Sequence, residues 1–450
     1  MRLYAGVAGA ALVIALVAAQ CVSRPDPPAE TGPFRRSPVA IGAVAGSADA
    51  FVDSIGVNTH LRYSDTSYGE FPLVKQRLLE LGIRHIRDEV TRDTPDVYAR
   101  LNDLSRSGIR STLVMGRPEY GGKKNPYGSL DQLYQVFVDE LLDTAVAVEG
   151  PNEMDLSDVG GWASKTSSYQ KRLYARMSKS GSTRDLLVLA PSIGRYEDRS
   201  RYIQMGNLVS ATDIGNLHLY PGGVMLTTDR LNESLEHGAL VAGNAAVHIT
   251  ETGYHQSPSA TDQPEGHPAT TPAEAGVLMP RILAEAFRGG VDRTFIYELV
   301  DQYNDPRTAE SNFGLLTWDF RPKPAFTSVK NLLSIVSDRT ARGAPAGAPA
   351  PGLDIRTSSG DVRTLVLQKA DGTLLLLVWR EVPPSPTLAC ADSSPAGSVA
   401  VTVAAASGFG VARTYRPSCS AEPLREAAVT GELTVSATAD ITVIELVRQP

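Results

Sequence analysis

The chain has 450 residues, of which 42% are hydrophobic and 21% are charged, and its formal net charge is −7. This length is too great for one small core and suits a barrel of about 250 to 300 residues with a smaller partner domain. The charges form no long run of one sign, so nucleic-acid binding is not expected, and neither is strong attraction of acidic glycans.

The N-terminus has the pattern of an export signal. After Arg2, an uncharged apolar run extends to Ala19 and ends in small residues that suit cleavage. Residues 1–21 are therefore expected to be a signal peptide or an anchor, with lipid attachment at Cys21 and an uncleaved membrane helix as alternatives. Each of these places the protein outside the cytoplasm, secreted or attached to the outer face of the membrane. The Pro- and Ala-rich residues 22–45 are interpreted as a disordered linker.

From Phe51 onward, short apolar strands alternate with amphipathic helices, as in a parallel sheet with crossover helices. The expected strands are Ser54–Asn58, Ile83–Arg87, Ser111–Met115, Ala145–Glu149, Leu186–Ala190, Ile214–His218, Ala246–Glu251 and Arg293–Tyr297. The expected helices are Phe71–Leu81, Pro95–Ser107, Ser129–Leu142, Lys165–Ser180, Arg199–Leu208, Asp229–His237, Pro272–Arg288 and Pro324–Val336. Eight such units predict a (β/α)8 TIM barrel over residues 46–340. An open doubly wound sheet is the alternative, but no early strand ends in its Gly-rich phosphate turn.

A second domain is expected after the barrel. Residues 341–352 consist almost entirely of Ala, Pro and Gly and are interpreted as a linker. Beyond them the pattern changes to strands alone, at Val362–Lys369, Thr373–Arg380, Ser398–Ala404, Ala412–Tyr415, Glu432–Ser436 and Asp440–Val447. Asp371-Gly372 favours a tight hairpin, because this pair tolerates the positive φ that such a turn needs. Residues 353–450 are therefore predicted to form a small β-sandwich.

Two cysteines, Cys390 and Cys419, lie in this expected β-sandwich. In an oxidising compartment such a pair is more often a disulfide than a metal or catalytic site. We therefore expect a disulfide bond between them, with two separate buried thiols as the alternative.

Candidate catalytic residues stand at the C-terminal ends of two expected strands, where a barrel gathers its reacting groups. Asn152-Glu153 follows the fourth strand, and the seventh strand ends at Glu251. Two carboxylates at one rim suit cleavage of a glycosidic bond, since one protonates the leaving oxygen and the other bonds or stabilises the anomeric carbon. Glu149 is an alternative acid, although its place inside the strand favours a buried, paired carboxylate.

In these residues the sequence resembles glycoside hydrolase clan A, and within it family 39, whose barrel also has an attached β-sandwich. The resemblance covers residues 51 to about 336 and implies that Glu153 is the general acid/base and Glu251 the nucleophile of a retaining enzyme. The substrate-binding residues expected at the same rim are Asn152, Arg87, His60, His218, Tyr220, Tyr297 and Glu298. The tryptophan usual at the end of strand eight is replaced by the Tyr297-Glu298 segment, which leaves the sugar undetermined.

Some of these rim residues have a structural alternative. His60 either binds substrate or caps the first loop, and the acidic residues near strands two and eight either hold sugar hydroxyls or are solvated rim charges: Asp88, Glu89, Glu298 and Asp301. Four aromatic residues in expected rim loops could stack on sugars: Tyr63, Tyr120, Tyr127 and Trp162. Trp379, in the expected β-sandwich, is assigned to the core.

No spacing of His, Cys or Asp residues indicates zinc or calcium, and no nucleophile elbow indicates a serine hydrolase, so neither metal nor cofactor is expected. The expected function is that of an exported, monomeric retaining glycoside hydrolase acting on an extracellular or cell-wall polysaccharide or oligosaccharide. One alternative is a non-catalytic carbohydrate-binding or scaffold barrel, which has no need of both glutamates. The other is a transglycosylase, which would use the same pair.

Overall fold

The computed structural model describes residues 45–118, 127–157, 159–263, 267–338, 353–384, 390, 397–404 and 408–448. The expected signal or anchor at residues 1–21 and the linker at residues 341–352 lie outside these ranges, as does nearly all of the linker at residues 22–45. Within the described ranges, no helix combines the length and apolar character needed to cross a membrane.

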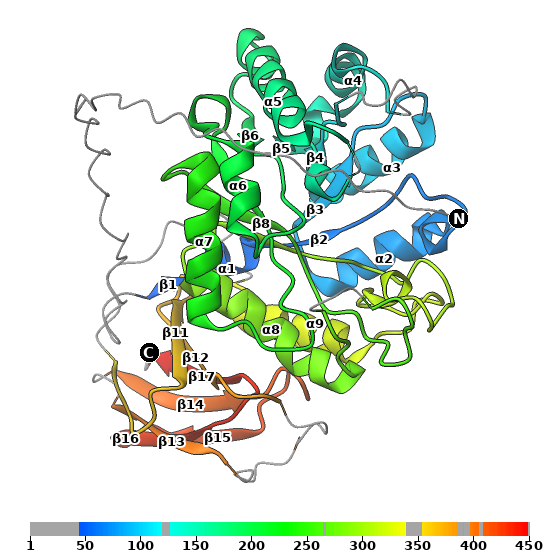
Figure 1. Cartoon of the computed structure of the whole chain (residues 1–450). Helices are drawn as coiled ribbons and strands as arrows, with labels where there is room; N and C mark the ends of the chain where they lie inside the picture. Colours follow the sequence, from blue (N-terminus) through cyan, green and yellow to red (C-terminus); the bar gives the residue numbers. More distant parts are fainter. Residues whose placement is uncertain are drawn as a thin grey trace, which may run out of the picture. The chain divides into compact units, whose positions relative to one another are not determined.

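Parallel strands close into an eight-stranded barrel, which confirms the sequence-based prediction (Figure 1). In order around the barrel, the strands are β2 (Ile55–Asn58), β3 (His85–Glu89), β4 (Arg110–Val114), β5 (Ala145–Glu149), β6 (Leu187–Leu189), β7 (Ile214–His218), β8 (Ala246–Thr252) and β9 (Arg293–Ile296). Strand β9 pairs with β2 and closes the ring. A close approach at this seam requires glycine, because a Cβ at Gly56 would lie 2.5 Å from the Phe295 ring.

The helices that follow the barrel strands come in the expected order, whereas the short first helix, Ala48–Asp53, was not predicted (Figure 1). The helices are α1 (Ala48–Asp53), α2 (Phe71–Leu81), α3 (Pro95–Arg106), α4 (Leu130–Val136), α5 (Trp162–Lys179), α6 (Arg199–Met205), α7 (Thr228–Ala242), α8 (Pro272–Arg288) and α9 (Pro324–Val336). Capping boxes fix two of the starts, with Ser129 and Gln132 at α4 and Thr271 and Glu274 at α8. Beyond α4, the chain continues as a π-helical turn over Phe137–Leu141.

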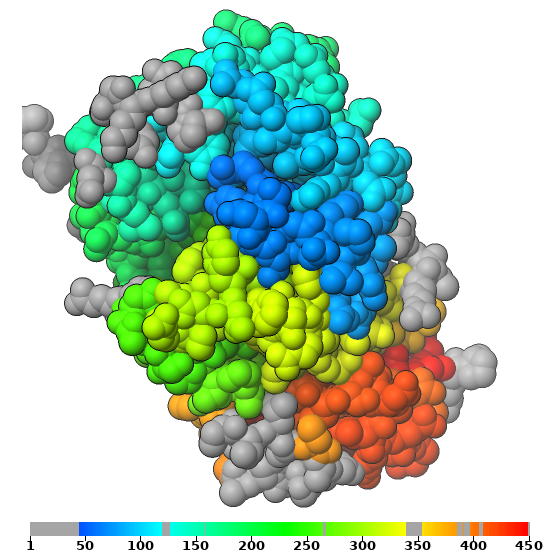
Figure 2. Space-filling model, turned by 90° about the vertical axis from the view of Figure 1, so that its right-hand side faces the viewer, coloured from blue at the N-terminus to red at the C-terminus, as the bar shows by residue number. Residues whose placement is uncertain are grey.

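The chain segments after β2 and β9 lie side by side at one part of the barrel rim. Figure 2 shows the blue surface of the first barrel residues against the yellow-green surface of the segment that follows β9. Ser67 links the two, because its hydroxyl donates to the backbone oxygens of Asp301 and Trp318, both at 2.9 Å. The first and last loops of the barrel are thereby joined.

Two antiparallel sheets form the C-terminal domain, as predicted. The larger sheet has the order β1 (Gly46–Ser47), β11 (Val362–Gln368), β12 (Leu374–Arg380), β17 (Thr442–Arg448), β14 (Phe409–Tyr415) and β15 (Arg425–Ala428). The smaller sheet has the order β10 (Asp354–Thr357), β13 (Val399–Ala404) and β16 (Glu432–Ala437). The sequence did not indicate β10 and β15, which are short, polar strands at sheet edges. Strand β1 pairs in parallel with β11, so the first described residues extend the sandwich rather than the barrel.

Strand β12 joins the two domains because it is buried on both faces. Side chains alternate along a strand, so successive residues serve different cores. The sandwich core takes Leu374, Leu376 and Val378, and the barrel-side core takes Leu375, Leu377 and Trp379. Trp379 is therefore a core residue, as expected. Polar contacts strengthen the junction, since Arg281 of α8 donates to the backbone oxygens of Val382 and Ala439 at 2.9 and 3.1 Å.

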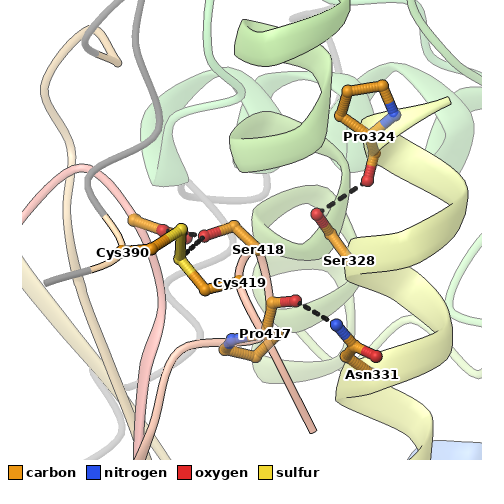
Figure 3. The surroundings of a disulfide bond; sticks show 8 residues. Pro324, Ser328, Asn331, Cys390, Pro417, Ser418 and Cys419 are labelled. Carbon is orange, nitrogen blue, oxygen red and sulfur yellow. Dashed lines mark hydrogen bonds between the residues drawn. A yellow bond between two sulfur atoms is a disulfide. The ribbon is translucent and has the colours of Figure 1, made fainter. Parts of the chain in front are cut away.

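The expected disulfide bond joins Cys390 to Cys419, whose Cα atoms are 5.5 Å apart (Figure 3). The backbone oxygen of neighbouring Pro417 accepts a hydrogen bond of 2.8 Å from Asn331 of α9. Figure 3 shows the cross-linked turn facing that helix. The disulfide therefore lies where the β-sandwich meets the barrel.

Replacing both cysteines, Cys390→Ser and Cys419→Ser, should lower the stability of the folded protein. The bridge spans 29 residues, and closing a loop of that size contributes about 3 to 4 kcal/mol. The expected result is a lower melting temperature in calorimetry. The wild-type protein should show the same lower melting temperature after its disulfide is reduced. Modification of Cys390 and Cys419 by a thiol reagent in unreduced, purified protein, detected by peptide mass spectrometry, would contradict the pairing.

Candidate active site

Strand ends on one rim of the barrel bring the candidate residues together. Strand β3 carries Arg87, β5 ends at Glu149 and leads to Glu153, β7 ends at His218, and β8 carries Glu251 near its end. In a parallel barrel the C-terminal ends of all strands meet at the same face. Residues that are far apart in the sequence are thus brought within hydrogen-bonding distance.

The buried guanidinium of Arg87 is the centre of this network, and all five of its N–H groups have acceptors. Nε and Nη2 donate to the two oxygens of Glu149 at 2.7 and 2.8 Å, and Nη1 donates to Glu251 Oε1 at 2.6 Å. Nη1 also donates to Asn58 Oδ1 at 2.9 Å, and Nη2 to Asn152 Oδ1 at 2.6 Å. Burial lowers the pKa of Arg87, but the two carboxylates more than offset this and raise its pKa above the ordinary value.

Glu149 is the fixed counter-ion of this arginine. Its side chain is completely buried and receives both arms of the guanidinium. A carboxylate with no exposed surface cannot meet a substrate in this conformation. The geometry therefore favours the paired, structural alternative for Glu149 over the role of proton donor.

Glu251 is held as an anion by three neighbours. Besides Arg87, the hydroxyl of Tyr220 donates to its Oε2 at 2.7 Å, and His218 Nδ1 lies 3.3 Å from the same oxygen. Burial raises the pKa of Glu251, but the charges of His218 and Arg87 and the hydrogen bond from Tyr220 hold the pKa below its ordinary value. The carboxylate is thus available as a nucleophile at neutral pH.

Glu153 lies opposite, in a left-handed backbone conformation with φ 45° and ψ 43°. A residue other than glycine adopts this region at a cost, so the fold must hold it there. One restraint is the hydrogen bond of 3.1 Å from its backbone N–H to Ser192 Oγ. Its side chain remains 22% exposed. Burial and the charge of Glu251 raise the pKa of Glu153 against the opposing effect of His218, which favours its protonated form.

His218 connects the two glutamates from a completely buried position. Its Nδ1 is 2.7 Å from Glu153 Oε1, and its Nε2 is 3.0 Å from Thr250 Oγ1. Thr250 uses its hydroxyl hydrogen for Asn216 Oδ1 at 2.6 Å, while the Asn216 amide donates to the oxygen of Ala190. Thr250 must therefore accept from His218, which places a proton on Nε2. Burial lowers the pKa of His218, but the charges of Glu251 and Glu153 raise it overall.

The reactive atoms are close together. One oxygen each of Glu153 and Glu251 and a ring nitrogen of His218 all lie within 4.8 Å of one another. By donor type these side chains could also hold a metal ion. At 2.7 Å, however, His218 and Glu153 are within direct hydrogen-bonding distance, which accounts for their approach without an ion.

A pocket opens beside this cluster. It holds about 690 Å³ of empty space, including the open solvent at its mouth. The residues that line it are Asn58, Thr59, His60, Tyr63, Arg87, Asp88, Glu89, Val114, Gly116, Arg117, Tyr127, Asn152 and Glu251. Polar groups and aromatic rings lie together on its walls, a mixture typical of pockets that bind small molecules.

His60 forms one wall of this pocket among aromatic rings. It stacks on Tyr63 with ring centroids 5.0 Å apart and meets Tyr68 and Tyr297 edge-on. Its Nε2 lies 3.5 Å from Glu298 Oε2. Burial lowers the pKa of His60 to about 4, so the ring is neutral at neutral pH. A neutral imidazole can donate to or accept from a sugar hydroxyl.

The two expected residues after strand eight are placed differently from each other. The ring of Tyr297 packs edge-on against Tyr220 and Phe313, and its hydroxyl donates to Glu310 at 2.5 Å. Glu298 is completely buried and accepts from Tyr68, and burial raises its pKa well above the ordinary value. With no exposed surface, Glu298 supports the pocket wall from behind instead of meeting a substrate in this conformation.

Other rim residues also differ from one another. Asp88 and Glu89 line the pocket, whereas Asp301 forms a buried ion pair of 2.8 Å with Lys323. The expectation of an exposed aromatic at Trp162 is wrong, because this residue starts α5 with only 8% exposure. Tyr63 and Tyr127 do line the pocket, and Tyr120 lies outside the described residues.

Sequence reasoning missed Arg117 and Glu310. Arg117 lines the pocket and packs against the Tyr127 ring at 4.9 Å, and Glu310 accepts the hydrogen bond from Tyr297. A signal for Arg117 was present, since it comes two residues after the expected third strand, at the rim that carries the other candidates. Glu310 belongs to the long segment after β9, where no periodicity marks a position.

Comparison with solved structures shows the fold. A family 39 glycoside hydrolase from Bacteroides cellulosilyticus WH2 matches with TM-score 0.59 and 15% identity over 90% of this chain and 83% of its own. A monomeric beta-xylosidase from Caulobacter crescentus CB15 matches with TM-score 0.56 and 16% identity, over 91% and 98% respectively. This chain has their fold. Neither family models nor curated proteins give a match to the sequence.

The comparison extends to a glucosidase from Croceicoccus marinus, with TM-score 0.56 and 12% identity over 91% of this chain and 97% of that one. At the level of fold, the expected resemblance to family 39 and to clan A barrels is therefore confirmed. Because the matches span nearly the whole length of both chains, they include the β-sandwich as well as the barrel.

The substitution Glu149→Gln should destabilise the protein strongly. It leaves the buried Arg87 with one carboxylate instead of two, and breaking a buried ion pair costs about 3 to 5 kcal/mol. The measurement is urea unfolding followed by circular dichroism. Glu89→Gln is the matched control, because its ion pair with Arg62 is partly exposed and should contribute no more than about 1 kcal/mol. Equal stability of Glu149→Gln and wild type would contradict the role of Glu149 as counter-ion.

Proposed function

We propose that this protein is a retaining glycoside hydrolase, with Glu251 as nucleophile and Glu153 as general acid/base. The observation that carries the proposal is the environment of these two carboxyl groups. One oxygen of Glu153 lies within 4.8 Å of one oxygen of Glu251, Glu251 lines an open pocket, and the pKa is lowered at Glu251 and raised at Glu153. This environment favours the ionised form of Glu251 and the protonated form of Glu153, as the two catalytic roles require.

The short separation supports the double-displacement route. Retaining enzymes hold their two carboxyl groups about 5 to 5.5 Å apart, whereas inverting enzymes leave room for a water molecule between carboxylate and sugar. Glu251 would attack the anomeric carbon while Glu153 transfers its proton to the leaving oxygen. In the second step, Glu153 would take a proton from a water molecule while the oxygen of that water attacks the anomeric carbon. This attack breaks the bond between the sugar and Glu251 and releases the product.

Three neighbouring side chains, Arg87, Tyr220 and His218, support these two reaction steps by the way they are positioned. Arg87 and Tyr220 each bind one oxygen of Glu251, so they orient the carboxylate before attack. In the first step, Glu251 loses its negative charge when it bonds to the sugar, and Glu153 becomes negatively charged when it gives up its proton. His218 contacts both carboxyl groups and can stabilise the charge on either side.

We further propose that the protein works outside the cytoplasm on an extracellular or cell-wall glycan. The disulfide between Cys390 and Cys419 supports this location, because structural disulfides are typical of oxidising compartments. The N-terminal export pattern agrees with it. The pocket is open to solvent, which suits a substrate longer than the sugar that it holds.

Glu153→Gln should slow hydrolysis of substrates with poor leaving groups by roughly 100- to 10,000-fold, because they need a proton donor. Aryl glycosides with activated leaving groups, built on the sugar that a polysaccharide screen identifies, should retain most of their first-step rate. Wild-type activity should fall as the pH rises through the raised pKa of Glu153, and this alkaline limb should disappear in the variant. An equal loss on both substrate classes would assign the acid role elsewhere.

Glu251 should become covalently labelled during turnover. A 2-fluoro glycoside of the cleaved sugar should trap the intermediate on the peptide that contains Thr250, Glu251 and Thr252, as detected by mass spectrometry. In Glu251→Ala, azide should restore part of the activity and yield a glycosyl azide of inverted configuration. Inversion in the first products of the wild-type enzyme, observed by NMR, would refute the proposed mechanism.

A further inference from the structure

A second hollow lies next to the catalytic pocket and shares a wall with it. It holds about 950 Å³ of empty space, including open solvent. It is lined by Arg117, Pro118, Gly128, Ser129, Leu130, Ser164, Lys165, Ser168, Tyr169 and Arg172. Arg117 borders both hollows, so they adjoin at the end of β4. We call this second hollow the lateral groove.

The lateral groove has walls from two helices. Helix α5 contributes Lys165, Ser168 and Arg172, which fall on one side of the helix because residues three and four apart are neighbours. The start of α4 provides the opposite wall. Tyr169 is buried at the base, where its hydroxyl donates to the backbone oxygen of Met115 at 2.5 Å. The hydrogen bond ties this wall to the end of β4.

Among the residues that the structure describes, the charged side chains that line the lateral groove are all basic. They are Arg117, Lys165 and Arg172, and no described carboxyl group lines it. Lys165 and Arg172 are exposed and have no ion-pair partner among the described residues. Asp131, an acidic residue on α4, lies outside the lining and pairs with Arg176 instead. The ammonium group of Lys165 and the guanidinium group of Arg172 are therefore available to a ligand.

We propose that the lateral groove is a binding site for an anionic sugar unit of the glycan, one that carries a carboxylate or a sulfate. The proposal rests on the proposed function in placing the groove on the path of the substrate chain. A guanidinium and an ammonium facing a hollow with serine hydroxyls match both the charge and the hydroxyl groups of such a sugar. The adjoining catalytic pocket would take the neighbouring unit. The overall charge of −7 does not oppose this, because solvent ions largely screen charges that lie more than about 10 Å away.

Isothermal titration calorimetry of the full mature chain tests the proposal with defined probes. Tetragalacturonate carries carboxylates, its fully methyl-esterified form is the uncharged match, and a sulfated carrageenan tetrasaccharide supplies the other anion. At least one anionic probe should bind roughly tenfold more tightly than the ester. The variant Lys165→Gln/Arg172→Gln should weaken that binding by roughly tenfold. Whichever of the two anionic probes binds more tightly shows whether the groove prefers a carboxylate or a sulfate.

The control variant is Lys171→Gln/Lys179→Gln, which removes the same charge from exposed positions of α5 outside the lateral groove. It should leave the affinity unchanged. Failure of both anionic probes to bind better than the ester, or an equal loss in the control variant, would overturn the proposal. Because binding needs no bond cleavage, Glu251→Gln can be titrated in parallel. If the wild-type protein binds the anionic probe but its Glu251 is never labelled by the 2-fluoro glycoside, the hydrolase mechanism alone is refuted.

Discussion

The buried charge of Arg87 is the constraint on which the site depends. A guanidinium removed from water must have its charge and its five N–H groups matched by acceptors, and here the strand ends supply them. Glu149 pairs with it through both carboxylate oxygens, and Asn58, Asn152 and Glu251 accept from the three other N–H groups. Glu251 is left with a single oxygen bound to Arg87, so it stays ionised and oriented without losing its contact with the pocket.

The contacts of Arg87 also explain why the pKa shifts of Glu153 and Glu251 are opposite. Burial raises the pKa of both Glu153 and Glu251, although the Glu153 side chain keeps 22% of its surface exposed. Only Glu251 receives the direct bonds from Arg87 and Tyr220, and its negative charge then acts on Glu153 to raise that pKa. The asymmetry arises from which neighbours each glutamate meets, since the residue type is identical.

Secondary structure was largely predictable because its signals are local. The capping residues Ser129 and Thr271 and the first-turn prolines mark helix starts within a few residues, and the buried parallel strands are short apolar runs. Strand β1 could not be predicted, because its two residues form a strand only by pairing with β11, which follows the entire barrel in the sequence. Trp162 was misplaced because α5 begins at Trp162, three residues before the expected start at Lys165, so the ring packs as part of the helix and not in a rim loop.

The sequence by itself determined which residues stand at the rim, because position at the end of a parallel strand fixes that directly. Glu153, Glu251, Arg87 and His218 were all identified in this way. Tertiary structure alone decided their protonation and exposure, since these depend on neighbours contributed by other strands. It buried Glu298 behind the wall, and it placed Arg117 between two hollows. Such features result from the packing of distant segments, which no local pattern records.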